Sequence, residues 1–334
     1  MKFGIQLNHE YSKTADLQVR AEQLVEMAHL ARDCGYSYLF GMHHLLSSLA
    51  TFQPLPLLSR LVPESGDMKL GVGVFLSNYE HPVHLAENWA TLDQLSGGRV
   101  IFGCGAGYRR NEFDTLGIDR TRRWSRMTES IELLKQFWTG EPVTFEGQHF
   151  RVDGEACSIL PAQRPHPPIW IGANGEKTVR KAARLGDAWI APPNVKANWV
   201  KGHLQYFLDE LDQTGVEREG RAYPLIREMY IGDSDEAVDR EARDYIKAEY
   251  AEYSNPEYGE DVQLWKSMFD EFREKAFLFG DADTISDKLK DFNAAGFNVF
   301  LFRVSWGEMP FEQAMANIAR FAEEVMPRFQ EARV

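Results

Sequence analysis

The feature that most constrains the fold of this chain is the alternation of short β-rich runs with helical runs along nearly its whole length. Such alternation is typical of a parallel sheet, because each strand must be carried back by a crossover before the next parallel strand can begin. The β-rich runs predict eight strands, at roughly Lys2–Leu7, Ser37–Met42, Lys69–Leu76, Arg99–Cys104, Pro168–Gly172, Ala188–Ala191, Leu225–Ile231 and Asn298–Val304. The sequence therefore predicts an α/β fold.

Helices are expected between these strands, where apolar residues recur at three- and four-residue spacing. The clearest are Leu17–Asp33, His84–Leu95, Arg122–Trp138, Lys177–Leu185 and Ile285–Ala295. Eight strands in this alternation fit a TIM (β/α)8 barrel, although an open doubly wound sheet gives the same local signals. The number of strands favours the barrel.

The length of 334 residues permits a single barrel domain, and we expect residues 1–334 to form one. Two stretches, near 140–167 and 233–275, are too long for simple connections and are expected to be insertions. Insertions of this length are usually lids or binding loops. The alternative for the charged segment 239–252 is a solvated surface helix.

Charge and cysteine content exclude several classes of partner. A formal net charge of −13 repels phosphate backbones and anionic lipids, so we expect no nucleic-acid and no membrane partner. The 3 cysteines are widely spaced and form no CxxC pair, which argues against disulfides and a thiolate metal site. The opening MKFGIQLNHE is no signal peptide, and no apolar run could span a membrane, so we expect a soluble cytoplasmic protein.

Two adjacent histidines, His43 and His44, follow the second predicted strand. Residues at the carboxyl ends of barrel strands carry the chemistry, so both are expected at the barrel mouth and are candidate catalytic residues. Successive side chains of a strand point to opposite faces, which argues against a tight chelate, and we expect no metal. The alternative is that one histidine is packed and the other solvated.

Two glycine-rich turns follow later strands. The first, Gly103–Gly107, has GxGxG spacing instead of the GxGxxG of dinucleotide-binding folds, so it indicates either a flat ligand near the backbone or simply crowded strands. The second, Gly172-Ala173-Asn174-Gly175-Glu176-Lys177-Thr178, leads into a predicted helix. Its free N–H groups and helix dipole, with Lys177 and Thr178, favour a phosphomonoester, and an ordinary strand–helix connection is the alternative.

Four segments together resemble the bacterial luciferase-like flavin-dependent monooxygenases. They are FGIQL, MHHL, HPVHLAENWATLDQLSGGRVIFGCGAGYRRNEFDTLG and PPIWIGANGEKTVRKAARLGDAWI, and a weaker likeness returns at 280–327. The resemblance implies a TIM barrel with an insertion, and reduced FMN or deazaflavin F420 at its carboxyl face. It also implies that His43 is the active-site histidine with His44 beside it, although Met42 stands where luciferases carry an acid.

The same resemblance implies where the flavin is held. Its phosphate falls on the turn 174–178, and a basic residue that luciferases offer after the fourth strand is replaced by Ala106, with Arg109 or Arg110 as candidate substitutes. An unusual backbone conformation, such as a non-proline cis peptide, is expected in Val74–Leu76. The further candidate cofactor contacts are Asn8, Phe75, Ser77, Gly105 and Ala173.

The leading hypothesis is a flavin-dependent monooxygenase that uses reduced FMN and O2 to oxidise a small organic substrate, with a separate flavin reductase as partner. One alternative is an F420-dependent oxidoreductase that transfers hydride, because the arginines between residues 109 and 126 could hold an acidic cofactor tail. Another is a flavin-binding protein without turnover. A homodimer is expected from the resemblance alone.

Overall fold

The computed structural model describes residues 1–254, 258 and 268–329, and a parallel sheet forms its centre. The hydrogen-bonded order is β11-β10-β7-β5-β3-β1-β14-β12-β13, with β6 paired to β7. The strands of this sheet are β1 (Lys2–Gln6), β3 (Tyr38–Gly41), β5 (Lys69–Val72), β6 (Phe75–Leu76), β7 (Val100–Gly105), β10 (Ile169–Gly172), β11 (Ala188–Ile190), β12 (Pro224–Ile231), β13 (Leu278–Gly280) and β14 (Val299–Arg303).

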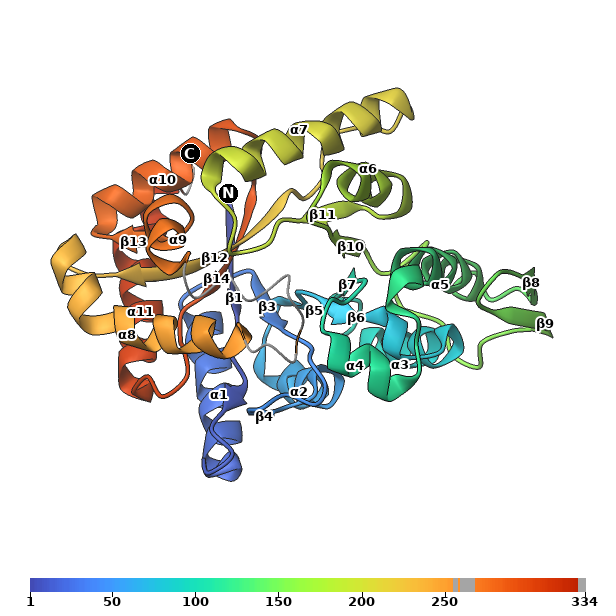
Figure 1. Ribbon diagram of the computed structural model, residues 1–334, viewed down its shortest axis with the longest axis horizontal. Coiled ribbons are helices and arrows are strands. Elements are labelled where there is room, and N and C mark those ends of the chain that lie inside the picture. The colour runs from blue at the N-terminus through green and yellow to red at the C-terminus, as the bar shows by residue number, and fades with distance from the viewer. Residues whose placement is uncertain (255–257, 259–267, 330–334) are drawn as a thin grey trace.

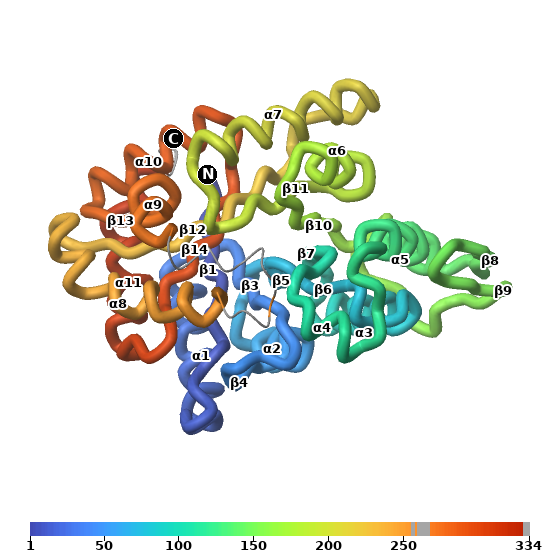
Figure 2. The backbone as a smooth tube through the Cα atoms, viewed as in Figure 1, coloured from blue at the N-terminus to red at the C-terminus, as the bar shows by residue number. Residues whose placement is uncertain are grey.

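The α-helices surround the strands, which converge in the middle of the molecule (Figure 1). They are α1 (Leu17–Asp33), α2 (Pro54–Leu61), α3 (Pro82–Leu95), α4 (Arg110–Leu116), α5 (Arg123–Phe137), α6 (Glu176–Leu185), α7 (Ala197–Gln213), α8 (Asp235–Tyr253), α9 (Phe269–Lys275), α10 (Ala282–Ala294) and α11 (Phe311–Glu324). The tube in Figure 2 shows the first strand, β1, beside the last, β14, as their parallel pairing requires. Among the described residues, no helix is long and apolar enough to cross a membrane.

The sheet curves back toward its own edge. An isolated parallel bridge joins Ala191, just after β11, to Leu225 in β12. Among the described residues, β11 and β12 are joined by this one bridge and by no longer ladder of paired residues. Complete closure into an eight-stranded barrel therefore stays a prediction. β14 pairs with the amino-terminal half of β12, from Pro224 to Glu228. The short strand β13 pairs with the carboxyl-terminal end of β12, from Met229 to Ile231.

Strand alternation explains which side chains fill the inside of the curved sheet. Tyr38 and Phe40 on β3 point inward, as do Val299 and Leu301 on β14, and the intervening residues join the outer core beneath the helices. The inner apolar group consists of Tyr38, Phe40, Ile101, Trp170, Ala188, Ile190, Ile226, Val299 and Leu301. Gln6 and Arg303 share this inward face and are buried at the carboxyl ends of β1 and β14, which form part of the mouth of the sheet, where the loops that follow the strands meet.

The two expected insertions have different structures. Residues 140–167 contain an antiparallel hairpin of β8 (Val143–Glu146) and β9 (Arg151–Glu155), which projects beside α5 (Figure 1). Glu129 of α5 holds its turn by accepting the N–H groups of Gln148 and His149, each at 2.8 Å. The region 233–275 supplies α8 and α9, and its residues 255–257 and 259–267 lie outside the described part of the chain.

The third predicted strand, Lys69–Leu76, is interrupted. A non-proline cis peptide joins Gly73 to Val74, and the chain is divided there into β5 and β6. The unusual peptide thus lies at the beginning of the stretch Val74–Leu76 in which it was expected. A second antiparallel pair, β2 (Glu10–Tyr11) with β4 (Ala50–Thr51), closes over the loop that carries the two histidines.

Candidate active site

His43 lies at the carboxyl end of β3, where its ring stacks on Phe75 with 4.3 Å between ring centroids. The backbone N–H of Leu76 donates to His43 Nδ1 over 3.1 Å, so the neutral ring carries its proton on Nε2. Burial, and secondarily the charge of His44, lower the pKa of His43 from 6.5 to about 3. His43 is therefore a neutral imidazole at pH 7, and the side chain of Gln53 is a further hydrogen-bond partner of its ring.

His44 contacts a different partner, the buried carboxylate of Glu112 on α4. Its Nδ1 lies 3.2 Å from Glu112 Oε1, which also accepts the Leu45 N–H over 2.8 Å. The hydroxyl of Tyr79 donates to Glu112 Oε2 over 2.6 Å. Burial alone would raise the pKa of Glu112, but these partners and the charge of Arg109 outweigh it and lower that pKa. One carboxylate thus links the loops that follow β3, β6 and β7.

A second buried carboxylate, Glu10, faces the same mouth. The hydroxyl of Tyr253, at the end of α8, donates to Glu10 Oε2 over 2.6 Å. Burial alone would raise the pKa of Glu10, but the charges of His44 and Arg109 and the Tyr253 hydrogen bond lower it. Glu10 is therefore held as an anion next to the histidine loop.

An ion network joins α8 to the strands. Arg303, at the end of β14, lies 3.0 Å from Glu228 of β12 and also pairs with Glu249 of α8. Trp306 Nε1 donates to Glu228 over 2.6 Å, and Asn8 Nδ2 donates to Glu249 over 2.7 Å. Burial raises the pKa of Glu249 to about 8, against the opposing charge of Arg303. These contacts fix α8 beside the mouth.

The turn predicted to hold a phosphate lies at the N-terminus of α6. The hydroxyl of Thr178 accepts the Gly175 N–H over 3.1 Å and donates to the Gly175 carbonyl over 2.9 Å, so it caps the helix. Glu176 forms an ion pair with Arg180 at 3.1 Å. The backbone N–H groups of Glu176 and Lys177 have no hydrogen-bond partner among the described residues. An anion here would meet those two amides and the exposed Lys177 side chain, beside the exposed Asn174.

The other candidate cofactor contacts have different surroundings. Ser77 Oγ is buried without a hydrogen-bond partner in the described part of the chain, so its hydroxyl is available to a ligand. Asn8 instead uses its amide group toward Glu249 and Ser305. Phe75 packs beneath His43 and against Trp89 in the outer core, which makes it a support for the histidine.

Gly105 and Ala173 have packing reasons for their small size. A Cβ at Gly105 would lie 2.5 Å from Cγ2 of Val74, and one at Gly103 would lie 1.9 Å from the carbonyl oxygen of Val72. Crowding between strands, the second interpretation of the GxGxG turn, therefore explains both glycines. Ala173 is buried, and its carbonyl accepts the indole N–H of Trp189 over 2.9 Å.

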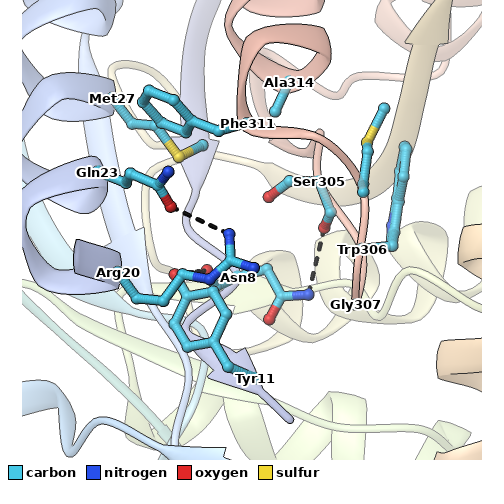
Figure 3. Close-up of a pocket in the computed structure, with 11 residues that line it drawn as sticks. Asn8, Tyr11, Arg20, Gln23, Met27, Ser305, Trp306, Gly307, Phe311 and Ala314 are labelled. Carbon is cyan, nitrogen blue, oxygen red and sulfur yellow. Dashed lines mark hydrogen bonds between the residues drawn. The ribbon is translucent and has the colours of Figure 1, made fainter. Parts of the chain in front are cut away.

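A small pocket borders the network at Asn8 (Figure 3). It lies between α1 and the loop that joins β14 to α11, and Figure 3 shows Asn8 hydrogen-bonded to the carbonyl of Ser305 at its wall. Arg20 covers the ring of Tyr11 from the α1 side, 5.1 Å from the ring centroid. The volume of about 30 Å³ holds one or two water molecules, so this pocket is too small for a flavin.

The burial of the ions around the mouth was not predicted from the sequence, although Arg109 was named as a candidate substitute for a basic residue. These ions are Glu10, Arg109, Glu112, Glu228, Glu249 and Arg303. A local signal existed for Glu228 and Arg303, because a charge within the otherwise apolar strands LIREMYI and VFLFR must find a partner. Glu112 and Glu249 lie on helices, where charges are ordinary, so their burial depends on contacts that no local pattern reveals.

Comparison with known proteins places this site in a family. A family model described as luciferase-like monooxygenase matches residues 1–298. The oxygenase component of a flavin-dependent trigonelline monooxygenase from Acinetobacter baylyi is 24% identical, and the match covers 100% of this chain and 97% of that protein. An F420-dependent hydroxymycolic acid dehydrogenase from Mycobacterium tuberculosis is 34% identical over 196 residues, which cover 56% of this chain and 52% of the dehydrogenase.

Solved structures share the fold along the whole chain. A monooxygenase from Streptomyces bottropensis superposes with a TM-score of 0.86 at 23% identity, covering 99% of this chain and 100% of that one. An F420-dependent secondary alcohol dehydrogenase has a TM-score of 0.81 at 19% identity, with 99% of each chain covered. The family model extends over most of the sequence, so this chain is an oxidoreductase enzyme and belongs to the luciferase-like monooxygenase family.

Proposed function

We propose that this enzyme is a monooxygenase that uses reduced FMN and O2 to oxidise a small organic substrate, and that a separate flavin reductase supplies the reduced FMN. The observation that carries the proposal is His43, a buried neutral imidazole that carries its proton on Nε2 at the carboxyl end of β3. The full-length relative from Acinetobacter baylyi supports it, because that protein is named as the oxygenase component of a flavin-dependent monooxygenase.

The residues at the mouth suit a flavin in two respects. The Ser77 hydroxyl is buried without a partner among the described residues, and a ligand at the mouth would supply one. The amides of Glu176 and Lys177, with the positive end of the α6 dipole, suit the phosphate. When bound, FMN would supply the redox chemistry and the reaction with O2, and the protein would supply position, charge and exclusion of water.

His43 would act as a hydrogen-bond donor to the reacting oxygens. The Leu76 N–H fixes the tautomer, and stacking on Phe75 fixes the ring plane, so Nε2–H has one direction in which to donate. The low pKa keeps the ring neutral throughout, so its Nε2–H serves as a hydrogen-bond donor and the ring does not take up a second proton. His44, engaged by Glu112, would shape the pocket without exchanging protons with substrate.

The test of this role is His43→Asn, since the Asn Oδ1 can accept the Leu76 N–H while no donor remains at the position of Nε2. With reductase and FMN present, we expect product formation to fall about a hundredfold or more while FMN affinity changes by a few fold. Oxygen consumption and hydrogen peroxide are measured together with product. Full coupled turnover in the variant would show that His43 is only a packing residue.

A second candidate function is F420-dependent hydride transfer, without O2. Two observations favour it: the relative with 34% identity uses F420, and Arg120, Arg122, Arg123 and Arg126 gather between α4 and the first turns of α5. The guanidinium groups of Arg120 and Arg123 donate to nearby carbonyl oxygens, at Tyr108 and Arg120 respectively, so both side chains are held against this partly exposed surface. An acidic cofactor tail would suit that surface.

Parallel fluorescence titrations of the apoprotein with reduced FMN and with reduced F420 separate the two cofactors. We expect tighter binding of reduced FMN, and preferential binding of F420 would reverse the proposal. The proposal also includes one barrel domain closed by eight strands and a homodimer, which small-angle scattering and sedimentation would check.

A further inference from the structure

The side chain of Arg109 has a combination of burial and missing partners that the proposed chemistry does not explain. It is 1% exposed and shares a side-chain hydrogen bond with Tyr108, yet its Nε and Nη1 have no hydrogen-bond partner among the described residues. Unpaired N–H groups of a buried cation cost free energy, because water has been removed and nothing has replaced it. Such donors are expected where a ligand completes the site.

The surroundings of Arg109 define the position of that ligand. The guanidinium carbon lies 3.9 Å from the ring centroid of Tyr258 and 5.6 Å from that of Tyr253. The Tyr253 hydroxyl in turn contacts Glu10 and the sulfur of Met42, which follows β3 and precedes His43. Arg109 therefore lies over the mouth, one aromatic ring away from the strand that carries the histidine.

The two nearby carboxylates do not use the free N–H groups. Glu10 accepts from Tyr253, and Glu112 accepts from Leu45 and Tyr79 and pairs with His44. No oxygen of either lies within ion-pair distance of Arg109 among the described residues, although both raise its pKa through space, against the opposing effect of burial. The guanidinium is thus held in its charged form while its Nε–H and one terminal nitrogen remain open.

We propose that Arg109 binds a carboxylate group of the substrate, so that the enzyme acts on small organic carboxylates. Guanidinium groups bind carboxylates through charge-assisted hydrogen bonds, and flat tyrosine rings around the cation suit a planar acid. This inference rests on the proposed function only in assigning the mouth to the substrate. It deepens that function by giving the substrate an anionic group and an anchor.

The test compares each of three carboxylates with the amide of the same shape. Calorimetry measures binding of acetate, benzoate and phenylacetate, and of acetamide, benzamide and phenylacetamide, to the full chain loaded with FMN at constant ionic strength. We expect the best carboxylate to bind about tenfold or more tightly than its amide, and Arg109→Gln to abolish that preference. Arg110→Gln, which removes the neighbouring exposed arginine, is the matched control and should keep it.

Three outcomes would overturn the inference. Equal binding of acids and amides by the wild type would mean that the free N–H groups meet only water, and an unchanged preference in Arg109→Gln would place the anion elsewhere. A tenfold loss of FMN affinity in that variant with the preference intact would make Arg109 a cofactor ligand. If Arg109→Gln does not fold, Arg109→Met, which also removes the charge and the N–H groups, replaces it. Carboxylate preference without binding of either flavin would refute the proposed function and leave this inference standing.

Discussion

Acidification should destabilise this enzyme through His43, and the size of the effect follows from its burial. The pKa of His43 is lowered from 6.5 to about 3, so between these values the unfolded chain binds a proton that the folded chain refuses. The stabilisation is complete above pH 6.5 and is lost as the pH falls toward 3. Each unit costs about 1.4 kcal/mol, which gives about 2 kcal/mol at pH 5.

The assay is urea unfolding followed by circular dichroism at pH 7 and pH 5. The perturbation is His43→Asn, which keeps an acceptor for the Leu76 N–H and removes the titrating ring. Replacement of any buried residue changes stability at both pH values, so the measured quantity is the difference in unfolding free energy between them. His84→Asn, which removes an exposed histidine on α3, controls for the change in composition.

We expect the wild type to lose about 2 kcal/mol more than His43→Asn between pH 7 and pH 5. Equal losses in the two proteins would refute the reasoning, because they would mean that the folded protein accommodates a protonated His43 as easily as the unfolded chain does. The assignment of a neutral Nε2–H donor at the mouth would then fail as well.

Two further predictions use pairs of variants that serve as controls for each other. Lys177→Ala should weaken FMN binding about tenfold, measured by fluorescence quenching, with little change in stability. Thr178→Ala should instead lower the unfolding free energy by about 1 kcal/mol, because the Thr178 hydroxyl caps α6. The reverse pattern would show that the phosphate does not bind at this helix. Gly103→Ala should lower the unfolding free energy by about 3 kcal/mol or prevent folding, because the new Cβ would overlap the Val72 carbonyl. The Cβ of Gly202→Ala in α7 would meet nothing within 4 Å, so this variant should raise the unfolding free energy by up to about 1 kcal/mol. Comparable melting temperatures for the two alanine variants would contradict the crowding argument.

Local sequence patterns predicted most of the secondary structure because each element satisfies its own periodicity. The helix expected at Leu17–Asp33 has those bounds in the structure, where Asp16 caps its first turn. The strand Lys69–Leu76 was predicted as one element, and the cis peptide after Gly73 divides it. β13 was missed, because three residues are too few to show an alternation and its pairing with β12 depends on a distant segment.

The candidate site was predictable where it lies next to a strand end. His43 and His44 were identified from their position after β3, and their different partners agree with the expectation that neighbours on a strand diverge. The carboxylate beside His44 comes from Glu112, 68 residues later, and such a pairing has no trace in local sequence. Burial of the charges on α8 could not be predicted for the same reason, so the alternative of a solvated surface helix at 239–252 was only partly right: Glu249 is buried.

The attachment of α8 has a consequence for protein engineering. Glu249, Tyr250 and Tyr253 meet charged groups on three different strands or strand ends, since Glu249 pairs with Arg303, Tyr250 with Glu228 and Tyr253 with Glu10. An attempt to alter substrate range by grafting residues 233–275 from a relative would bring in a helix whose side chains do not match these three partners. Chimeras should therefore carry the donor's helix together with the donor's residues at the positions of Glu10, Glu228 and Arg303.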